Sequence, residues 1–121
     1  MKESKNNKYT EALTLYDLLI SVNPSLERKG KTMPYTSVNG HMYSFLSKEG
    51  VMGLRLSKID LDEFLLKFKS KLMIQHGRTM KEYVEVPPDV LKNTKVLTTY
   101  IKLSYTYVSG LKPKVTKKKA N

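Results

Sequence analysis

The first periodic stretch of the chain places apolar residues three or four positions apart. This spacing is typical of one face of an α-helix, and the stretch ends at Asn23-Pro24, where proline disfavours helical backbone. Leu15, Leu18 and Val22 widen the apolar stripe, so we expect this helix to be covered on more than one side. The spaced apolar positions are Tyr9, Ala12, Leu13, Tyr16, Leu19 and Ile20.

From Lys31 to Ser57 the pattern changes to short runs rich in Tyr, Val, Phe and Met. Asn39-Gly40 suits a two-residue type I′ hairpin turn, because both residues accept positive φ. A second turn is expected at Ser47-Lys48-Glu49-Gly50. The predicted pairs are Val38/His41, Ser37/Met42 and Thr36/Tyr43, followed by Leu46/Val51, Phe45/Met52 and Tyr43/Leu54.

Strand alternation then separates two faces of this three-stranded meander. We expect the mostly apolar face to form the core, and it consists of Thr36, Val38, His41, Tyr43, Phe45, Met52, Leu54 and Leu56. The opposite face consists of Tyr35, Ser37, Met42, Ser44, Leu46, Gly53 and Arg55.

A second helix is predicted after the meander, with Asp60 as N-cap and Glu63 completing a capping box. Its buried stripe consists of Leu61, Phe64, Leu65 and Phe68. Two strands follow, Leu72–Gln75 and Met80–Val86, and Pro87-Pro88 ends their pairing. The last helix starts with Asn93 or Thr94 at its cap and ends at Gly110.

These elements predict an α+β fold with two layers in the order α-βββ-α-ββ-α. The sheet has five mainly antiparallel strands, with the helices on one face. A chain of 121 residues fits one core, so we expect a single domain over 9–112, a disordered N-terminus over 1–8 and a basic disordered tail over 113–121.

Composition narrows the function classes. The chain has no cysteine, which excludes disulfides, thiolate metal sites and cysteine nucleophiles and favours a reducing compartment. The polar N-terminus lacks the apolar stretch of a signal peptide, and no run approaches membrane-spanning length. We therefore expect a cytoplasmic protein without a membrane partner.

The formal net charge is +11, and much of it lies at the C-terminal end. The last ten residues hold five lysines and no acid, so the body keeps only about half of the excess. Such a tail could bind phosphate polymers weakly and without sequence preference. The residues of this possible nucleic-acid contact are Lys112, Lys114, Lys117, Lys118 and Lys119.

Several short motifs occur in a characteristic order over roughly Thr10 to Pro113. They are Gly30-Lys-Thr-Met33, Asn39-Gly-His-Met-Tyr43, Gly53-Leu-Arg-Leu56, Lys81-Glu-Tyr-Val-Glu-Val-Pro87 and Leu111-Lys-Pro-Lys114. In these motifs the chain resembles the N-terminal domain of the TfoX family, bacterial proteins named for regulators of natural competence. The resemblance implies a small stand-alone two-layer α/β domain of the same element order, and none of the motifs encodes a chemical step.

Candidate catalytic groups are few. His41 and His76 are the only imidazoles and fall on different elements, whereas a catalytic zinc normally needs three protein ligands. We interpret His41 as a structural histidine at the core margin, with a general base as the alternative, and place His76 in a turn. Asp60, Asp62 and Glu63 are explained by the first turn of a helix. The expectation is therefore a non-enzymatic protein without metal or cofactor.

The non-core face of the meander is the more informative surface. Tyr35, Met42, Leu46 and Arg55 cannot all lie under the helices that cover Tyr43, and Tyr83 joins them if its strand is near. Aromatic, Met and Arg side chains are enriched at protein interfaces. The leading hypothesis is a regulatory interaction module. It binds a protein partner or a second copy of the chain through Tyr35, Met42, Arg55 and Tyr83. A solvated sheet face and nucleic-acid binding are the alternatives.

Overall fold

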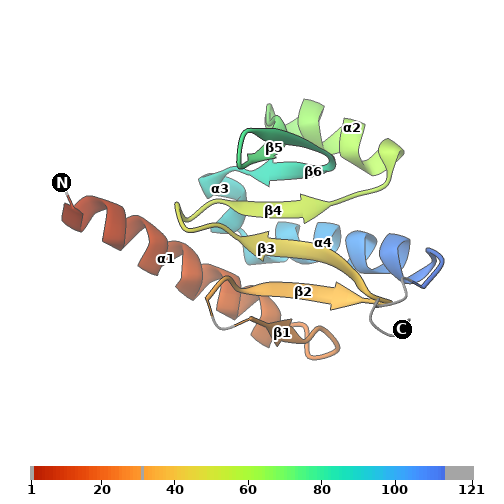
Figure 1. Ribbon diagram of the computed structural model, residues 1–121, viewed down its shortest axis with the longest axis horizontal. Helices are drawn as coiled ribbons and strands as arrows, with labels where there is room; N and C mark the ends of the chain where they lie inside the picture. Colours follow the sequence, from red (N-terminus) through yellow and green to blue (C-terminus); the bar gives the residue numbers. More distant parts are fainter. Residues whose placement is uncertain (1, 31, 114–121) are drawn as a thin grey trace, which may run out of the picture.

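The computed structural model describes residues 2–30 and 32–113, with side chains from Lys8 onward. Within these residues the chain forms four helices and one six-stranded antiparallel sheet of order β1-β2-β3-β4-β6-β5 (Figure 1). The helices are α1 (Lys2–Ser21), α2 (Lys58–Phe68), α3 (Pro88–Leu91) and α4 (Thr94–Ser109). The strands are β1 (Arg28–Lys29), β2 (Tyr35–Val38), β3 (His41–Leu46), β4 (Met52–Arg55), β5 (Leu72–Gln75) and β6 (Arg78–Val86).

The α+β class is confirmed, but the predicted five strands and the predicted element order are wrong. The additional strand β1 has only two residues, both exposed and charged, so it shows no apolar alternation that would reveal it. It forms because Arg28 and Lys29 pair with Thr36 and Tyr35 of β2. The additional helix α3 is a single short turn that begins directly after Pro87, too short for a periodic pattern.

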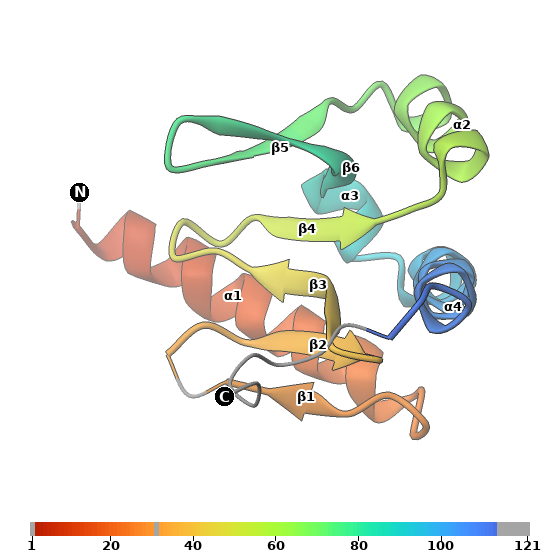
Figure 2. The ribbon, with the colours of Figure 1, turned by 45° about the vertical axis from the view of Figure 1, so that its right-hand side comes forward.

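The helices lie on the same side of the sheet. Figure 1 shows α3 and α4 behind the strands, and Figure 2 shows α1 behind β2 and β3. The main core fills the space between these two layers. Its largest fully buried side chains include Tyr16 from α1, Tyr43 from β3 and Phe64 from α2. Phe64 meets Tyr100 of α4 edge to face, with the ring centroids 5.2 Å apart.

The Asn39-Gly40 turn is confirmed. Both residues have positive φ, 57° and 78°, and Val38/His41 and Ser37/Met42 pair as predicted. The third predicted pair is wrong, because Thr36 pairs with Ser44 and leaves Tyr43 as the extra residue of a β-bulge. Beyond a bulge, strand alternation is shifted by one residue.

The predicted register of the second hairpin is also wrong. The loop runs from Ser47 to Val51 and is closed by the Ser47 N–H, which donates to the Val51 carbonyl at 2.9 Å. The observed pairs are Leu46/Met52, Phe45/Gly53 and Ser44/Leu54. Ser44 and Leu46 therefore face the helices, whereas Phe45 faces away from them. The face assignment of these three residues is corrected accordingly.

Local signals at the helix and turn ends are mostly confirmed. Asn93 caps α4, its Oδ1 accepting from the Val96 N–H at 3.2 Å, and His76 lies in a turn with φ of 53°. The predicted cap of α2 is wrong by one turn, because Ser57, and not Asp60, is the N-cap and its Oγ accepts from the Asp60 N–H.

The helical backbone of α1 starts at Lys2 and so includes most of the segment that the sequence predicts as disordered. The predicted disordered tail, apart from Pro113, lies outside the described residues. In the part of the chain that is described, no helix combines the length and the apolar character needed to cross a membrane.

Candidate interaction face

The sheet face turned away from the helices carries a hydrophobic cluster of its own. Phe45, Met73 and Tyr83 are buried at its centre. Half-buried side chains surround them, and we call the whole cluster the methionine face: Met33, Tyr35, Met42, Phe45, Val51, Met73, Met80 and Tyr83. Every member comes from a strand or from a loop beside one, so among the described residues no helix contributes to it.

Phe45 and Tyr83 form the platform of this face. Phe45 lies opposite Gly53 of β4, and a Cβ atom at Gly53 would stand 2.5 Å from Phe45 Cε1. The Phe45 ring therefore lies directly over the Gly53 backbone. It meets the Tyr83 ring edge to face, with centroids 5.7 Å apart. An aromatic pair thus connects β3 with β6 across β4, and it needs glycine between the two rings.

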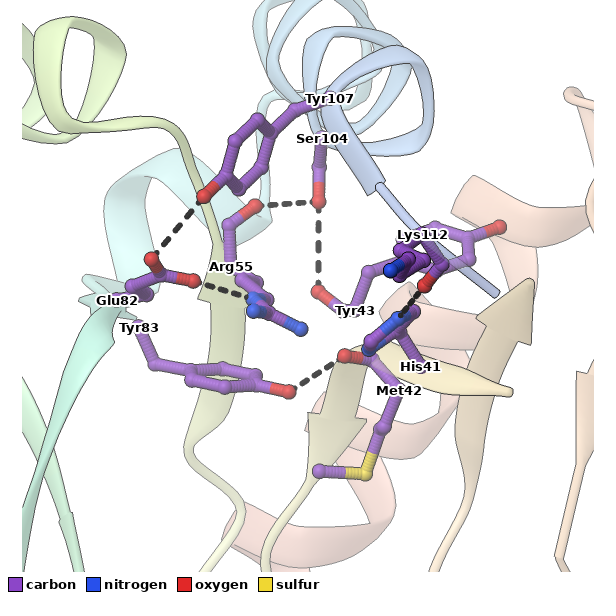
Figure 3. Close-up of polar contacts among 9 residues, drawn as sticks. All are labelled: His41, Met42, Tyr43, Arg55, Glu82, Tyr83, Ser104, Tyr107 and Lys112. Carbon is purple, nitrogen blue, oxygen red and sulfur yellow. Dashed lines mark hydrogen bonds and ion pairs between the residues drawn. The ribbon is translucent and has the colours of Figure 1, made fainter. Parts of the chain in front are cut away.

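Tyr83 is a structural member of the face. Its side chain is 9% exposed, and its hydroxyl donates to the Met42 carbonyl at 2.5 Å (Figure 3). Burial raises the pKa of Tyr83 to about 12, because the phenolate would lose its hydration. The nearby Arg55 acts in the opposite direction, and Glu82 acts in the same direction as burial. The hydroxyl is consequently a fixed donor at neutral pH.

This raised pKa predicts an alkaline loss of stability. The native state holds the Tyr83 proton up to about pH 12, whereas the unfolded chain releases it near the usual value of 10.0. The stabilisation is therefore complete below about pH 10 and disappears as the pH rises toward 12. Urea unfolding across this range should show a shallower decline for Tyr83→Phe than for the parent chain. Equal slopes for the two proteins would contradict the assignment.

Arg55 lies at the margin of the methionine face, directly opposite Tyr83 in the β4/β6 register. Its Nε donates to Glu82 Oε1 at 2.6 Å, and the Tyr107 hydroxyl donates to Glu82 Oε2 at 3.0 Å (Figure 3). The guanidinium carbon also lies 5.9 Å from the centroid of the Tyr107 ring. No hydrogen bond connects the two Nη groups to another described residue, and the side chain is 20% exposed.

The structure brings three of the four predicted partner-binding residues into one cluster. Tyr35, Met42 and Tyr83 belong to the methionine face, and Arg55 adjoins it. Leu46, which was predicted on this surface, is fully buried in the main core. Sequence reasoning missed Met33, Phe45, Val51, Met73 and Met80. Strand alternation along β5 is a signal that places Met73 on the methionine face. The side of the sheet on which Phe45 lies depends instead on the bulge at Tyr43, which the sequence does not reveal.

The other candidate residues lie at separate places in the structure. The Nε2 of half-buried His41 lies 2.9 Å from the Lys112 carbonyl, which connects β3 to the segment after α4. Asp62 forms an exposed ion pair with Lys58 one helical turn away. Among the described residues, no group of three His, Asp or Glu side chains could hold a metal. Lys114, Lys117, Lys118 and Lys119 lie outside the described residues.

A small cleft of about 160 Å³ lies between α1, α3 and the loop connecting β3 to β4. Its walls include the apolar side chains of Leu15, Val51 and Leu91 and the charged side chains of Lys8 and Glu85. His41 does not line it, so the only half-buried imidazole and this cleft are separate features.

The fold and the face together define an α+β protein in which the described helices all cover one sheet face and leave the other without a helix. No protein-family model, curated protein or solved structure matches the chain. The resemblance to the TfoX N-terminal domain therefore stays a prediction from its motifs.

Proposed function

We propose that this chain is a non-enzymatic interaction module that binds another protein through the methionine face. The observation that carries the proposal is the ring of half-buried Met33, Tyr35, Met42, Val51 and Met80 around the buried Phe45 and Tyr83. A layer of flexible apolar side chains that none of the described helices covers offers contact area that a partner can bury.

The chemistry of the face suits adaptable contact. Methionine side chains are unbranched and polarisable, so they repack against different surfaces at little strain. Arg55 adds planar donors at the margin, where its Nη groups can meet a carboxylate or a carbonyl of a partner. The buried Tyr83 ring packs beneath the half-buried side chains of the methionine face. We therefore expect Tyr83→Ala to lower the stability of the fold as well as to weaken partner binding.

We also propose that the chain is cytoplasmic and is a relative of the TfoX N-terminal domain. The motif order over roughly Thr10 to Pro113 supports the second proposal, and the absence of cysteine from the sequence supports the first. A regulatory role through protein contact fits both, with self-association as one of its possible forms.

Position-specific photo-crosslinking tests the proposed contact. A photoreactive residue at Tyr35 should give a defined crosslink in cells, and the same residue at exposed Lys95 of α4 should not. Changing Met42 and Met80 to glutamate should abolish the Tyr35 crosslink, because carboxylates in the layer oppose its desolvation. Crosslinks of equal yield at both positions would contradict the proposal, as would none at Tyr35.

The alternative is weak nucleic-acid binding through the C-terminal lysines, which the net charge of +11 favours. Removing residues 114–121 separates the two functions in the same preparation. The alternative expects DNA affinity to collapse and its salt dependence to flatten from a slope of at most about −4 to −5. The proposed module expects the Tyr35 crosslink to survive this truncation unchanged.

A further inference from the structure

The two edges of the sheet differ in how they are protected. At one edge, β1 has only two residues, Arg28 and Lys29, and both are exposed charges that discourage pairing with another strand. At the other edge lies β5, the strand Leu72–Gln75, which contains no charged residue (Figure 1). Its Ile74 side chain is 53% exposed. The charged strand residues that discourage pairing at β1 are therefore missing from β5.

The backbone directions along β5 follow from its pairing with β6. His76 and Gly77 both have positive φ, so they form a two-residue turn flanked by the hydrogen-bonded pair Gln75/Arg78. At the other end of β5, the Lys71 carbonyl accepts from the Glu85 N–H at 2.9 Å.

Alternation back from Gln75 turns the N–H and C=O groups of Met73 toward β6 and those of Ile74 toward the open edge. The register shift between Leu72 and Met73 adds its extra residues to β6 and not to β5, so the inward Lys71 carbonyl leaves the N–H and C=O groups of Leu72 turned outward. No backbone hydrogen bond outside the regular ladders joins Leu72 or Ile74 to another described residue. A row of spaced donors and acceptors is thus available to one more strand.

The charge around this edge selects the kind of strand. Lys69 and Lys71 precede β5, and Arg78 and Lys81 lie on the neighbouring β6; all four side chains are exposed. None of them forms an ion pair with another described residue. A second copy of this chain would bring the same cations to the same edge, and like charges there oppose self-pairing.

We propose that the open edge of β5 binds an extended acidic peptide segment of a partner protein as a seventh strand. This inference rests on the proposed function, because it assigns the partner's chemistry and its mode of contact. Hydrogen bonds to Leu72 and Ile74 hold the peptide backbone, and the surrounding cations attract its acidic side chains. Every second side chain of the peptide extends the methionine face beside Met73, and the others lie beside Ile74.

The test uses a fluorescein-labelled peptide of alternating glutamate and valine, about eight residues long. Fluorescence polarisation at low ionic strength should show binding to the full chain, and the corresponding lysine–valine peptide should not bind. Ile74→Pro should weaken binding about tenfold or more, because proline removes an outward N–H without touching the bonds to β6. Ile74→Thr keeps the N–H and is the matched control, with binding close to that of the parent.

Hydrogen exchange on the unmodified chain provides a second measurement, should Ile74→Pro fail to fold. The amides of Leu72 and Ile74 should exchange rapidly in the free protein and slowly with the glutamate–valine peptide bound. Slow exchange of both amides in the free monomer would overturn the proposal, since the edge would already be covered. If these two amides exchange more slowly as the concentration of the free protein rises, the proposal is also overturned, because a second copy of the chain would then cover the edge.

Charge reversal completes the design. Lys71→Glu with Arg78→Glu should weaken the glutamate–valine peptide about tenfold and leave the thermal unfolding of the chain nearly unchanged. Unchanged affinity would overturn the assignment of an acidic partner. If the peptide never binds while the Tyr35 crosslink persists, the edge proposal fails and the proposed function stands. If the parent protein binds the peptide but gives no Tyr35 crosslink, the proposed function fails and binding at the edge of β5 stands.

Discussion

Replacing Gly53 by alanine is expected to lower the free energy of unfolding by about 1–3 kcal/mol. The added Cβ would stand 2.5 Å from Cε1 and 2.8 Å from Cζ of Phe45, closer than unbonded carbons approach. Phe45 is 1% exposed and packs against Tyr83, so its ring has little room to withdraw. Because Gly53 lies in regular strand backbone without a positive φ, the expected loss arises from the clash alone.

Chemical denaturation of four variants measures this effect: Gly53→Ala, Gly110→Ala, Phe45→Leu, and Gly53→Ala combined with Phe45→Leu. Gly110→Ala is the matched control, because its Cβ would meet only the Thr106 and Tyr107 carbonyl oxygens at 3.6 Å. It should raise the stability by about 0.4–1 kcal/mol, because alanine fits this right-handed backbone without strain. Adding Phe45→Leu to Gly53→Ala should recover part of the loss, since the smaller side chain leaves space for the methyl group. Additive losses in the double variant would refute the steric explanation.

The same variant connects stability with the proposed function. The Phe45 ring supports the half-buried methionines above it, so its displacement changes the shape of the methionine face. Gly53→Ala should therefore weaken the Tyr35 crosslink even at temperatures where the chain is folded. Gly110→Ala should leave the crosslink intact, because Gly110 lies at the C-cap of α4 outside that cluster.

Replacing Ser44 by alanine is expected to cost about 2 kcal/mol of stability, within the range for buried polar groups that lose their partner. Ser44 Oγ lies 2.7 Å from the Tyr16 hydroxyl and 2.6 Å from Thr36 Oγ1. Tyr16, Thr36 and Ser44 are all fully buried. Burial also raises the pKa of Tyr16 far above its usual value, so its hydroxyl keeps its proton in the native state. The three hydroxyls form a closed polar group between α1 and the sheet.

Tyr16→Phe is the comparison that identifies this network. It removes one hydroxyl but leaves Ser44 and Thr36 bonded to each other, so the expected loss is smaller, about 1 kcal/mol. Urea unfolding of both single variants and of the double variant gives their coupling energy. A loss for Tyr16→Phe equal to or above that for Ser44→Ala would show that Ser44 does not hold the group together.

Residues close in sequence account for the features that could be predicted. The apolar spacing from Tyr9 to Ile20 predicts α1, and the Asn93 side chain marks the start of α4. The Asn39-Gly40 dipeptide accepts positive φ at two successive positions, which determines the first turn and its nearest pairs. Each of these depends on backbone preferences within a few residues. The α+β class follows from the resulting order of helices and strands.

The candidate face could be predicted only in part, and a single residue explains why. Tyr35 and Met42 belong to it as their strand positions indicate, but Phe45 was expected on the opposite face. A β-bulge adds one residue to one strand, and Tyr43 takes this position while packing edge to face with Tyr105 of α4. That contact joins residues far apart in sequence, so the local pattern carries no trace of it.

The sequence by itself determined the three long helices, the Asn39-Gly40 turn and the presence of more apolar side chains in the meander than one layer of helices can cover. These properties depend on neighbouring residues and on backbone torsion preferences. Only the tertiary structure decided which side chains face away from the helices, because α4 and the loop after Ser47 set the register of β3. It also decided that β1 and β5 are the two edge strands among the described residues, since the pairing of separate segments alone defines an edge.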